Sequence, residues 1–181
     1  EFGYESYIVG GCVRDYLLDR IPKDWDITTN ALPEDIIDIF TSLGYKIIPT
    51  GLKHGTVTVI IGKESFEITT YRIDGNYSDN RKEDLSRRDF TINAMAYNMQ
   101  EGLVDYFNGM EDIKNKVIRC VGDPNDRFND DNLRRLRAIR FACQLGFKIE
   151  ESTLSALIIN PQRIMLLSVE RIRDELCKIL L

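Results

Sequence analysis

The chain has 181 residues, of which 43% are hydrophobic and 29% are charged, and its formal net charge is −5. This is enough for one ample domain or two small ones, and the acidic total argues weakly against nucleic-acid binding. The four cysteines form no CxxC pair, there is one histidine, and no apolar run approaches the length of a membrane span. The composition therefore argues against a zinc site, a disulfide framework and a membrane protein, and favours reduced thiols in the cytoplasm.

The first two-thirds of the chain alternates between strand and helix patterns. Strands are expected at residues 7–9, 25–28, 45–48, 56–61, 65–71 and 103–107, and helices at residues 13–18, 33–40 and 90–99. Gly62-Lys63 is expected to turn a hairpin between two of these strands. The polar run at residues 74–83 is expected to be a loop.

From about Asp123 the pattern becomes helical, with helices expected at residues 129–145, 151–159 and 169–181. We place a domain boundary near Gly122-Asp123-Pro124, between a domain of residues 1–122 and a helical domain of residues 123–181. The fold class expected is α+β, with a mixed sheet and flanking helices followed by an all-α part.

Two short motifs near the start of the chain indicate nucleotide chemistry. Gly10-Gly11 closes an apolar strand and opens a helix, a geometry that exposes backbone N–H groups to an anion. Asp24 and Asp26 follow on a second strand, where residues two apart face the same side at about 6–7 Å between their Cα atoms. Either motif alone is usually only a turn or a solvated strand end. Together they predict a phosphate site beside a Mg²⁺ site.

A two-metal site needs a third carboxylate, and Glu67 is the best candidate. It interrupts a β-rich segment that is able to pair beside residues 25–28. The alternative interpretation of Glu67 is an exposed charge on a strand.

Two clusters of arginine have the chemistry to bind a nucleotide. The guanidinium groups of Arg87-Arg88 suit phosphate oxygens, and the carboxylate of Asp89 has the chemistry to accept from a ribose hydroxyl. Such a triplet alone is also common on surfaces.

Further along, Asp131, Arg134 and Arg137 share one stripe of the expected helix, with Arg140 at its border. A solvated basic face is the ordinary interpretation of this stripe. An acceptor-only and a donor-only side chain on one rigid helix also match the Watson–Crick edge of a base, as a protein template would.

The chain resembles the class II tRNA nucleotidyltransferases, meaning the CCA-adding enzymes and the bacterial poly(A) polymerases related to them. The resemblance covers nearly the whole chain and rests on five motifs in order. They are GGCVRDYLLDRIPKDWDITT, DLSRRDFTINAMAY, DYFNGMEDI, DDNLRRLRAIRFACQLGF and SVERIRDEL. It implies a nucleotidyltransferase (polymerase-β-like) head followed by a helical neck.

The resemblance also implies a role for each matching residue. Asp24 and Asp26 would bind Mg²⁺. Base reading of CTP or ATP would fall to Asp131 and Arg134. The remaining nucleotide contacts would come from Gly10, Gly11, Arg14, Arg88, Asp89, Arg137 and Arg140. The implied reaction extends the 3′ end of tRNA in the cytoplasm and involves no membrane. The oligomeric state stays open.

Three alternatives remain open at the level of sequence. The segment between Tyr71 and Arg87 is shorter than in family members that add the terminal A, which fits an enzyme that adds only CC. A poly(A) polymerase would use the same chemistry. An inactive RNA-binding module is disfavoured, because Asp24, Asp26 and Arg134 are all present.

Overall fold

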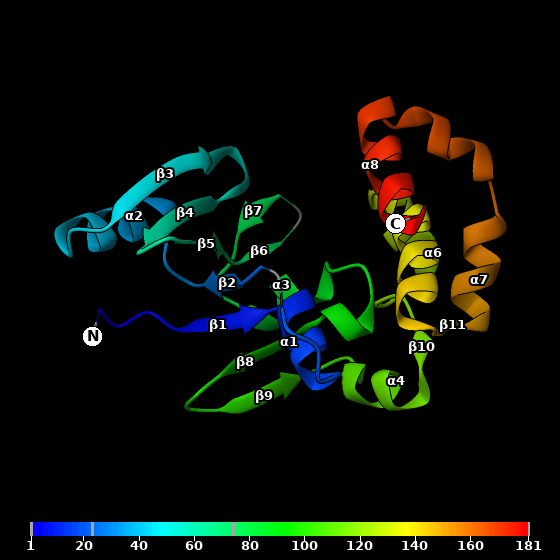
Figure 1. Ribbon diagram of the computed structural model, residues 1–181, viewed down its shortest axis with the longest axis horizontal. Coiled ribbons are helices and arrows are strands. Elements are labelled where there is room, and N and C mark those ends of the chain that lie inside the picture. Colours follow the sequence, from blue (N-terminus) through cyan, green and yellow to red (C-terminus); the bar gives the residue numbers. More distant parts are fainter. Residues whose placement is uncertain (1, 23, 74, 181) are drawn as a thin grey trace. The chain divides into compact units, whose positions relative to one another are not determined.

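The computed structural model describes residues 2–22, 24–73 and 75–180 (Figure 1). Its internal contacts divide it into two compact units. Unit 1 comprises Glu1–Arg87 and Asn93–Tyr106, and unit 2 comprises Arg88–Ile92 and Phe107–Leu181.

A seven-stranded mixed sheet forms the frame of unit 1, in the order β3-β4-β5-β2-β1-β8-β9. The strands are β1 (Ser6–Val9), β2 (Asp26–Thr29), β3 (Lys46–Gly51), β4 (Thr56–Ile61), β5 (Glu64–Thr70), β8 (Met95–Asn98) and β9 (Gly102–Asp105). All neighbours run antiparallel except β2 and β5, which are parallel. The predicted mixed sheet and the hairpin of β4 and β5 are thus confirmed.

The two faces of this sheet differ in chemistry because side chains alternate along each strand. One face is apolar and packs against α2 (Pro33–Ser42), with a core of Ala31, Ile36, Val57, Val59 and Ile68. Pro33 begins α2, and the Asp35 carboxylate accepts from the Leu32 amide at 3.2 Å, which caps the helix. The opposite face carries Asp26, Thr28, Glu67 and Thr69, so the face turned away from the α2 core is available for chemistry.

Short elements complete unit 1. They are α1 (Gly11–Leu17), η1 (Leu52–His54), β6 (Arg72–Ile73), β7 (Asn76–Tyr77) and α3 (Arg81–Ser86). The predicted loop at residues 74–83 is therefore partly regular, since β6 and β7 pair as a small hairpin and α3 begins inside it. Asp74, which belongs to that prediction, lies outside the described residues.

The helix predicted at residues 90–99 is wrong. The segment forms a short 3₁₀ turn, η2 (Thr91–Asn93), and then β8, which pairs with β1 on one side and β9 on the other. Ala94, Met95 and Ala96 favour helix locally, but all three are fully buried. Pairing with two strands overrides that local preference.

Unit 2 is mainly helical, and the helical part predicted from residue 123 onward lies within it. Its elements are α4 (Gly109–Asn115), β10 (Val117–Ile118), α5 (Pro124–Asp130), α6 (Leu133–Leu145), β11 (Lys148–Ile149), α7 (Glu151–Ile158), η3 (Pro161–Leu166) and α8 (Val169–Leu180). The buried rings of Phe90 and Phe141 meet edge to face at 5.8 Å in its core. β10 and β11 add a small parallel ladder that the sequence did not predict.

The helix predicted at residues 129–145 is two helices. Asp123 accepts from the Asn125 amide at 2.8 Å and Pro124 follows it, so α5 begins there and ends at Asp130. Asp131 then takes an extended conformation before α6. Within the described residues, no helix has both the length and the apolar character needed to cross a bilayer.

Candidate active site

The Gly-Gly turn has the predicted position between β1 and α1. Gly10 has φ 80° and ψ −132°, a conformation that strongly favours glycine, and α1 begins at Gly11. The Gly10 amide donates to the Met95 carbonyl of β8 at 3.3 Å. A methyl group on Gly11 would lie 3.6 Å from Nη2 of Arg14, so the turn and this arginine are close neighbours.

The guanidinium group of Arg14 is held inside unit 1. Its Nη2 forms an ion pair of 2.7 Å with Asp15, and its Nη1 donates to Oδ1 of Asn93 at 2.6 Å. The side chain is buried, and its plane is fixed by two partners from different elements. Arg14 therefore lies beside the Gly-Gly turn as a cation that is already oriented.

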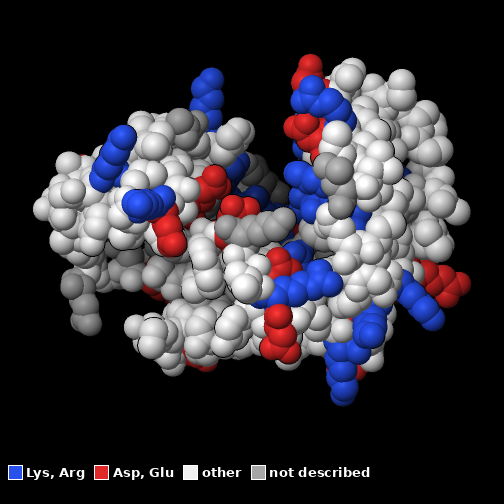
Figure 2. Space-filling model, in the orientation of Figure 1, with Lys and Arg blue, Asp and Glu red and all other residues white. Residues whose placement is uncertain are grey.

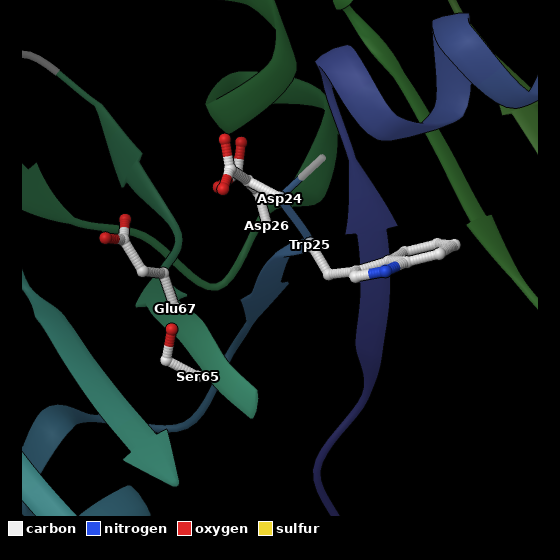
Figure 3. Close-up of a pocket in the computed structure, with 5 residues that line it drawn as sticks. All are labelled: Asp24, Trp25, Asp26, Ser65 and Glu67. Atoms are coloured by element: carbon white, nitrogen blue, oxygen red, sulfur yellow. The ribbon is translucent and has the colours of Figure 1, made fainter. Parts of the chain in front are cut away.

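Asp24 and Asp26 stand at the start of β2, and both are exposed. Figure 3 shows their carboxylates pointing the same way while the ring of Trp25 points away from them. β2 itself begins at Asp26, so Asp24 precedes the strand that was predicted to contain it. The two aspartates line a cavity of about 200 Å³ together with Trp25, Ser65 and Glu67.

Glu67 lies directly opposite Asp26 in the parallel ladder of β2 and β5. The predicted pairing of these two segments is confirmed. Opposite residues of a parallel pair share a face, so Glu67 belongs to the same side of the sheet as Asp26. In Figure 3 its carboxylate is set apart from those of the two aspartates. Across the described parts of the chain, no group of three His, Cys, Asp or Glu side chains is arranged to hold a metal ion.

The chemistry of the donor set nevertheless fits Mg²⁺. This ion is usually held by one or two carboxylates, keeps several of its waters, and takes further oxygens from substrate phosphates. Asp24 and Asp26 supply two exposed carboxylates beside a cavity, and the site contains no nitrogen or sulfur ligand that would favour another metal.

In unit 2, the segment that carries Arg88 and Asp89 is fixed through its backbone. The Val121 amide donates to the Asp89 carbonyl at 3.2 Å, and the Thr91 amide donates to the Arg119 carbonyl at 2.9 Å. Arg88 is half-buried and Asp89 is buried. Arg88 and Asp89, the predicted phosphate and ribose contacts, therefore belong to a segment that is held in place by backbone hydrogen bonds.

Asp89 and Arg137 form a close ion pair. Oδ2 of Asp89 lies 2.6 Å from Nη2 and 2.7 Å from Nε of Arg137 on α6. Burial alone would lower the pKa of Arg137, but the Asp89 carboxylate outweighs it, and the pKa of Arg137 is raised. This pair joins two of the predicted nucleotide contacts to each other.

The two predicted base-reading residues flank the start of α6. Asp131 lies just before the helix, where its Oδ1 accepts from the Leu133 amide at 3.0 Å. Arg134 lies on the first turn, and its Nη1 donates to the Arg127 carbonyl at 3.1 Å. Burial lowers the pKa of Arg134, partly offset by Asp89. The prediction that Asp131 shares a helical stripe with Arg134 is wrong, although the two still lie three residues apart.

Arg140 has a different environment from the one predicted. Its Nε lies 2.6 Å from the buried carboxylate of Glu175 on α8, and its guanidinium stacks 4.2 Å from the Phe141 ring. This contact fastens α6 to α8, which lie side by side in Figure 1. Figure 2 shows Lys and Arg side chains gathered on the face of unit 2 around these two helices.

Three residues that were not predicted as site residues contact predicted ones. Asn93 holds Arg14, Arg171 of α8 forms an ion pair with Asp131 at 2.8 Å, and Arg127 supports Arg134. Asn93 and Arg171 stand in two of the motifs that were recognised in the sequence. Their partners, however, come from distant parts of the chain, and no spacing rule identifies them.

Comparison with known proteins matches most of the chain to one family. Residues 6–119 match the family model described as poly A polymerase head domain. Residues 146–181 match a second model, described as probable RNA and SrmB-binding site of polymerase A.

Similar proteins align along the whole chain. A CCA-adding enzyme of Lactobacillus helveticus is 51% identical over 97% of the chain and 46% of its own length. One from Lactobacillus delbrueckii subsp. bulgaricus is 48% identical over 192 positions, covering 100% of the chain's 181 residues and 48% of its own length. That relative therefore has residues inside the matched region that this chain lacks. The chain spans about half the length of the curated relatives it matches.

A solved structure is also similar. The crystal structure of the Bacillus stearothermophilus CCA-adding enzyme in complex with CTP superposes with a TM-score of 0.93 at 44% identity. The match covers 98% of this chain and 45% of that one.

Proposed function

The chain belongs to the poly(A) polymerase head-domain family, and on that premise we propose that it is the nucleotide-transferring part of a CCA-adding enzyme. The observation that carries the proposal is the pair Asp24 and Asp26, exposed beside a cavity with Glu67 opposite Asp26. Relatives named CCA-adding enzyme that match the chain along its length support it. Residues 1–122 would be the catalytic head and residues 123–181 the helical neck.

Asp24 and Asp26 are the residues that would hold Mg²⁺, with Glu67 as the third carboxylate of the catalytic set. When bound, Mg²⁺ would neutralise charge on the triphosphate and favour deprotonation of the attacking hydroxyl. The exposed carboxylates leave room for the phosphate oxygens and waters that complete the coordination of this ion.

Each unit carries residues that would contact the nucleotide. Gly11, through its backbone N–H, and Arg14, as an oriented cation, would bind the triphosphate, and Gly10 would form the turn that presents them. Arg88 would contact the nucleotide, and Asp89 would accept from the ribose. Asp131 and Arg134 would read the base edge as acceptor and donor. Arg137 would support this set through Asp89, and Arg140 through the packing of α6 on α8.

The reaction would be an in-line displacement. The 3′-hydroxyl oxygen of tRNA attacks the α-phosphorus of CTP or ATP, a new phosphodiester bond forms, and the bond to pyrophosphate breaks. The hydroxyl proton leaves to solvent or to a nearby carboxylate. No covalent enzyme intermediate is needed. The substrates would be the tRNA 3′ end, CTP and ATP, in the cytoplasm.

One observation favours a second candidate within the same family. Among the described residues, the connection from β5 to Arg88 contains the small hairpin of β6 and β7 and the helix α3, and at least one relative has extra residues somewhere in the matched region. A connection this short has little reach, since an extended chain spans at most about 3.3–3.6 Å per residue. An enzyme with this connection would add CC and stop before A. A poly(A) polymerase would use the same site without a stop.

Sequencing the product tests these proposals. The complete protein is incubated with tRNA lacking CCA, Mg²⁺ and CTP alone, and then with CTP and ATP. We expect two C residues from CTP and a terminal A only when ATP is added. A product that ends at CC in both reactions would establish the CC-adding activity, and a long A tail the poly(A) polymerase. If no nucleotide were incorporated in either reaction, the result would favour the inactive RNA-binding module.

A further inference from the structure

A row of polar side chains runs along β2 on the face that bears the carboxylates. Asp26 and Thr28 are two residues apart on this strand, so they point to the same side. Asp26 is exposed at the open end, whereas Thr28 is buried. Beyond Thr28 the row ends at the carboxylate of Asp84 of α3, whose Oδ2 lies 3.4 Å from the Thr28 hydroxyl oxygen. The same hydroxyl lies 3.2 Å from the Thr69 carbonyl of β5.

Asp84 is fully buried and heavily bonded. Its Oδ1 accepts from Nη2 of Arg87 at 2.8 Å, from Nε of Arg87 at 3.1 Å, and from the Arg72 amide at 3.2 Å. A carboxylate is expensive to bury, and bonds to a cation and to backbone N–H groups offset that cost. The Asp84 carboxylate thereby contacts β6, the C-terminal end of α3 and the buried part of β2.

We propose that Asp84 is a positioning residue for the metal-binding end of β2, an inference that rests on the proposed function. β2 is four residues long, so a contact that fixes Thr28 also fixes Asp26 at the other end of the strand. Asp84 would set where the two metal-binding carboxylates stand without touching the metal itself.

The chain offers a local probe for this proposal. Trp25 is its sole tryptophan and lies between Asp24 and Asp26. Mn²⁺ prefers the same oxygen ligands as Mg²⁺ and is paramagnetic, so its binding at this site should quench Trp25 fluorescence. The titration reports metal binding without nucleotide transfer.

The chain also offers a matched control, Asp112 of α4. It is likewise buried, accepts from a threonine hydroxyl (Thr91, 2.6 Å) and forms an ion pair with an arginine (Arg119, 3.1 Å). Asp84→Asn and Asp112→Asn therefore make the same chemical change in equivalent surroundings. Both should lower the melting temperature, because each breaks a buried ion pair.

We expect Asp84→Asn to raise the Mn²⁺ concentration for half-maximal quenching by about tenfold, as removing support behind a metal ligand commonly does. The Mg²⁺ requirement for incorporation should rise in parallel, and Asp112→Asn should leave both titrations unchanged. The positioning role would be overturned if Asp84→Asn titrated like the wild-type protein. Equal shifts in Asp84→Asn and Asp112→Asn would overturn it as well.

If Asp84→Asn fails to fold, Thr28→Val serves instead, because it replaces the hydroxyl that faces Asp84 and the Thr69 carbonyl with a methyl group of similar size. A smaller shift in the same direction supports the proposal, and an unchanged titration overturns it. Wild-type protein that shows neither quenching nor incorporation would contradict the proposed function itself, which is a separate outcome.

Discussion

Arg171 of α8 donates through Nη2 to Oδ2 of Asp131 at 2.8 Å, while Oδ1 of the same carboxylate accepts from the Leu133 amide at 3.0 Å. Both oxygens of the proposed base-reading carboxylate are thus already engaged. The rotation of Asp131 is fixed from one side by α6 and from the other by α8. A base that hydrogen-bonds to Asp131 must share it with Arg171.

We expect Arg171→Ala to change the ratio of kcat/KM for CTP to that for ATP by about two- to fivefold, since a partly exposed ion pair contributes about 0.5–1 kcal/mol. Arg173→Ala is the matched control, because Arg173 lies on the same helix and pairs with its neighbour Asp174 at 3.0 Å. Equal losses for both nucleotides would show that Arg171 only stabilises the fold.

Asp24→Ala and Asp26→Ala should each abolish nucleotide transfer and leave the protein folded. Each removes a proposed metal ligand, and both residues are exposed. Neighbouring carboxylates repel one another when no metal is bound, so the melting temperature without Mg²⁺ should hold or rise slightly. Single-turnover incorporation and thermal unfolding measure the two effects. Transfer within about tenfold of wild type in both variants would refute the metal site.

Arg134→Ala should lose selectivity against GTP and UTP more than it loses rate with CTP and ATP. A hydrogen bond from a charged donor contributes about 1.5–3 kcal/mol, which corresponds to about ten- to a hundredfold in selectivity. Lys148→Ala is the control, since Lys148 is an exposed cation on β11 of the same unit. The protein-template idea fails if the two variants discriminate alike.

Glu150 predicts a pH dependence of stability. Its carboxylate accepts from the Ser152 hydroxyl at 2.7 Å and the Thr153 amide at 2.9 Å. Burial raises the pKa of Glu150, but these hydrogen bonds outweigh it and lower the pKa from 4.5 to about 2. The folded-state pKa is therefore depressed, so Glu150 stabilises the fold above pH 4.5 and loses that effect as the pH falls toward 2.

Glu150→Gln should accordingly lower the melting temperature at neutral pH, and the difference from wild type should shrink as the pH falls toward 2. Melting curves across this range provide the measurement. A constant difference at every pH would contradict the lowered pKa.

The parts of the fold that the sequence predicted best are those where one local rule suffices. Alternation identifies β4 and β5, and Gly62-Lys63 turns them into a hairpin. The pairing of the Glu67 segment beside residues 25–28 was also predicted, but the register that places Glu67 opposite Asp26 was not.

The predictions failed where distant contacts decide the local structure. Residues 95–98 lie between two strands and become a strand themselves, although Ala94-Met95-Ala96 favours helix. Asp131 was assigned to one continuous helix, but it is extended and lies between the end of α5 and the start of α6. Arg14 contacts Asn93, Asp131 contacts Arg171, and Asp84 contacts Thr28. The two residues of each pair are far apart in the sequence, so spacing along the chain could not reveal these contacts.

The ladder that places Asp26 opposite Glu67 makes this region intolerant of single-residue insertions and deletions. Because side chains alternate, losing one residue from β5 would turn Ile68 toward the carboxylates and Glu67 toward α2. Such a change would disrupt the core and the site in one event. Length variation in this part of the sheet should therefore be confined to the Gly62-Lys63 turn, and there to changes that keep the register of β4 and β5.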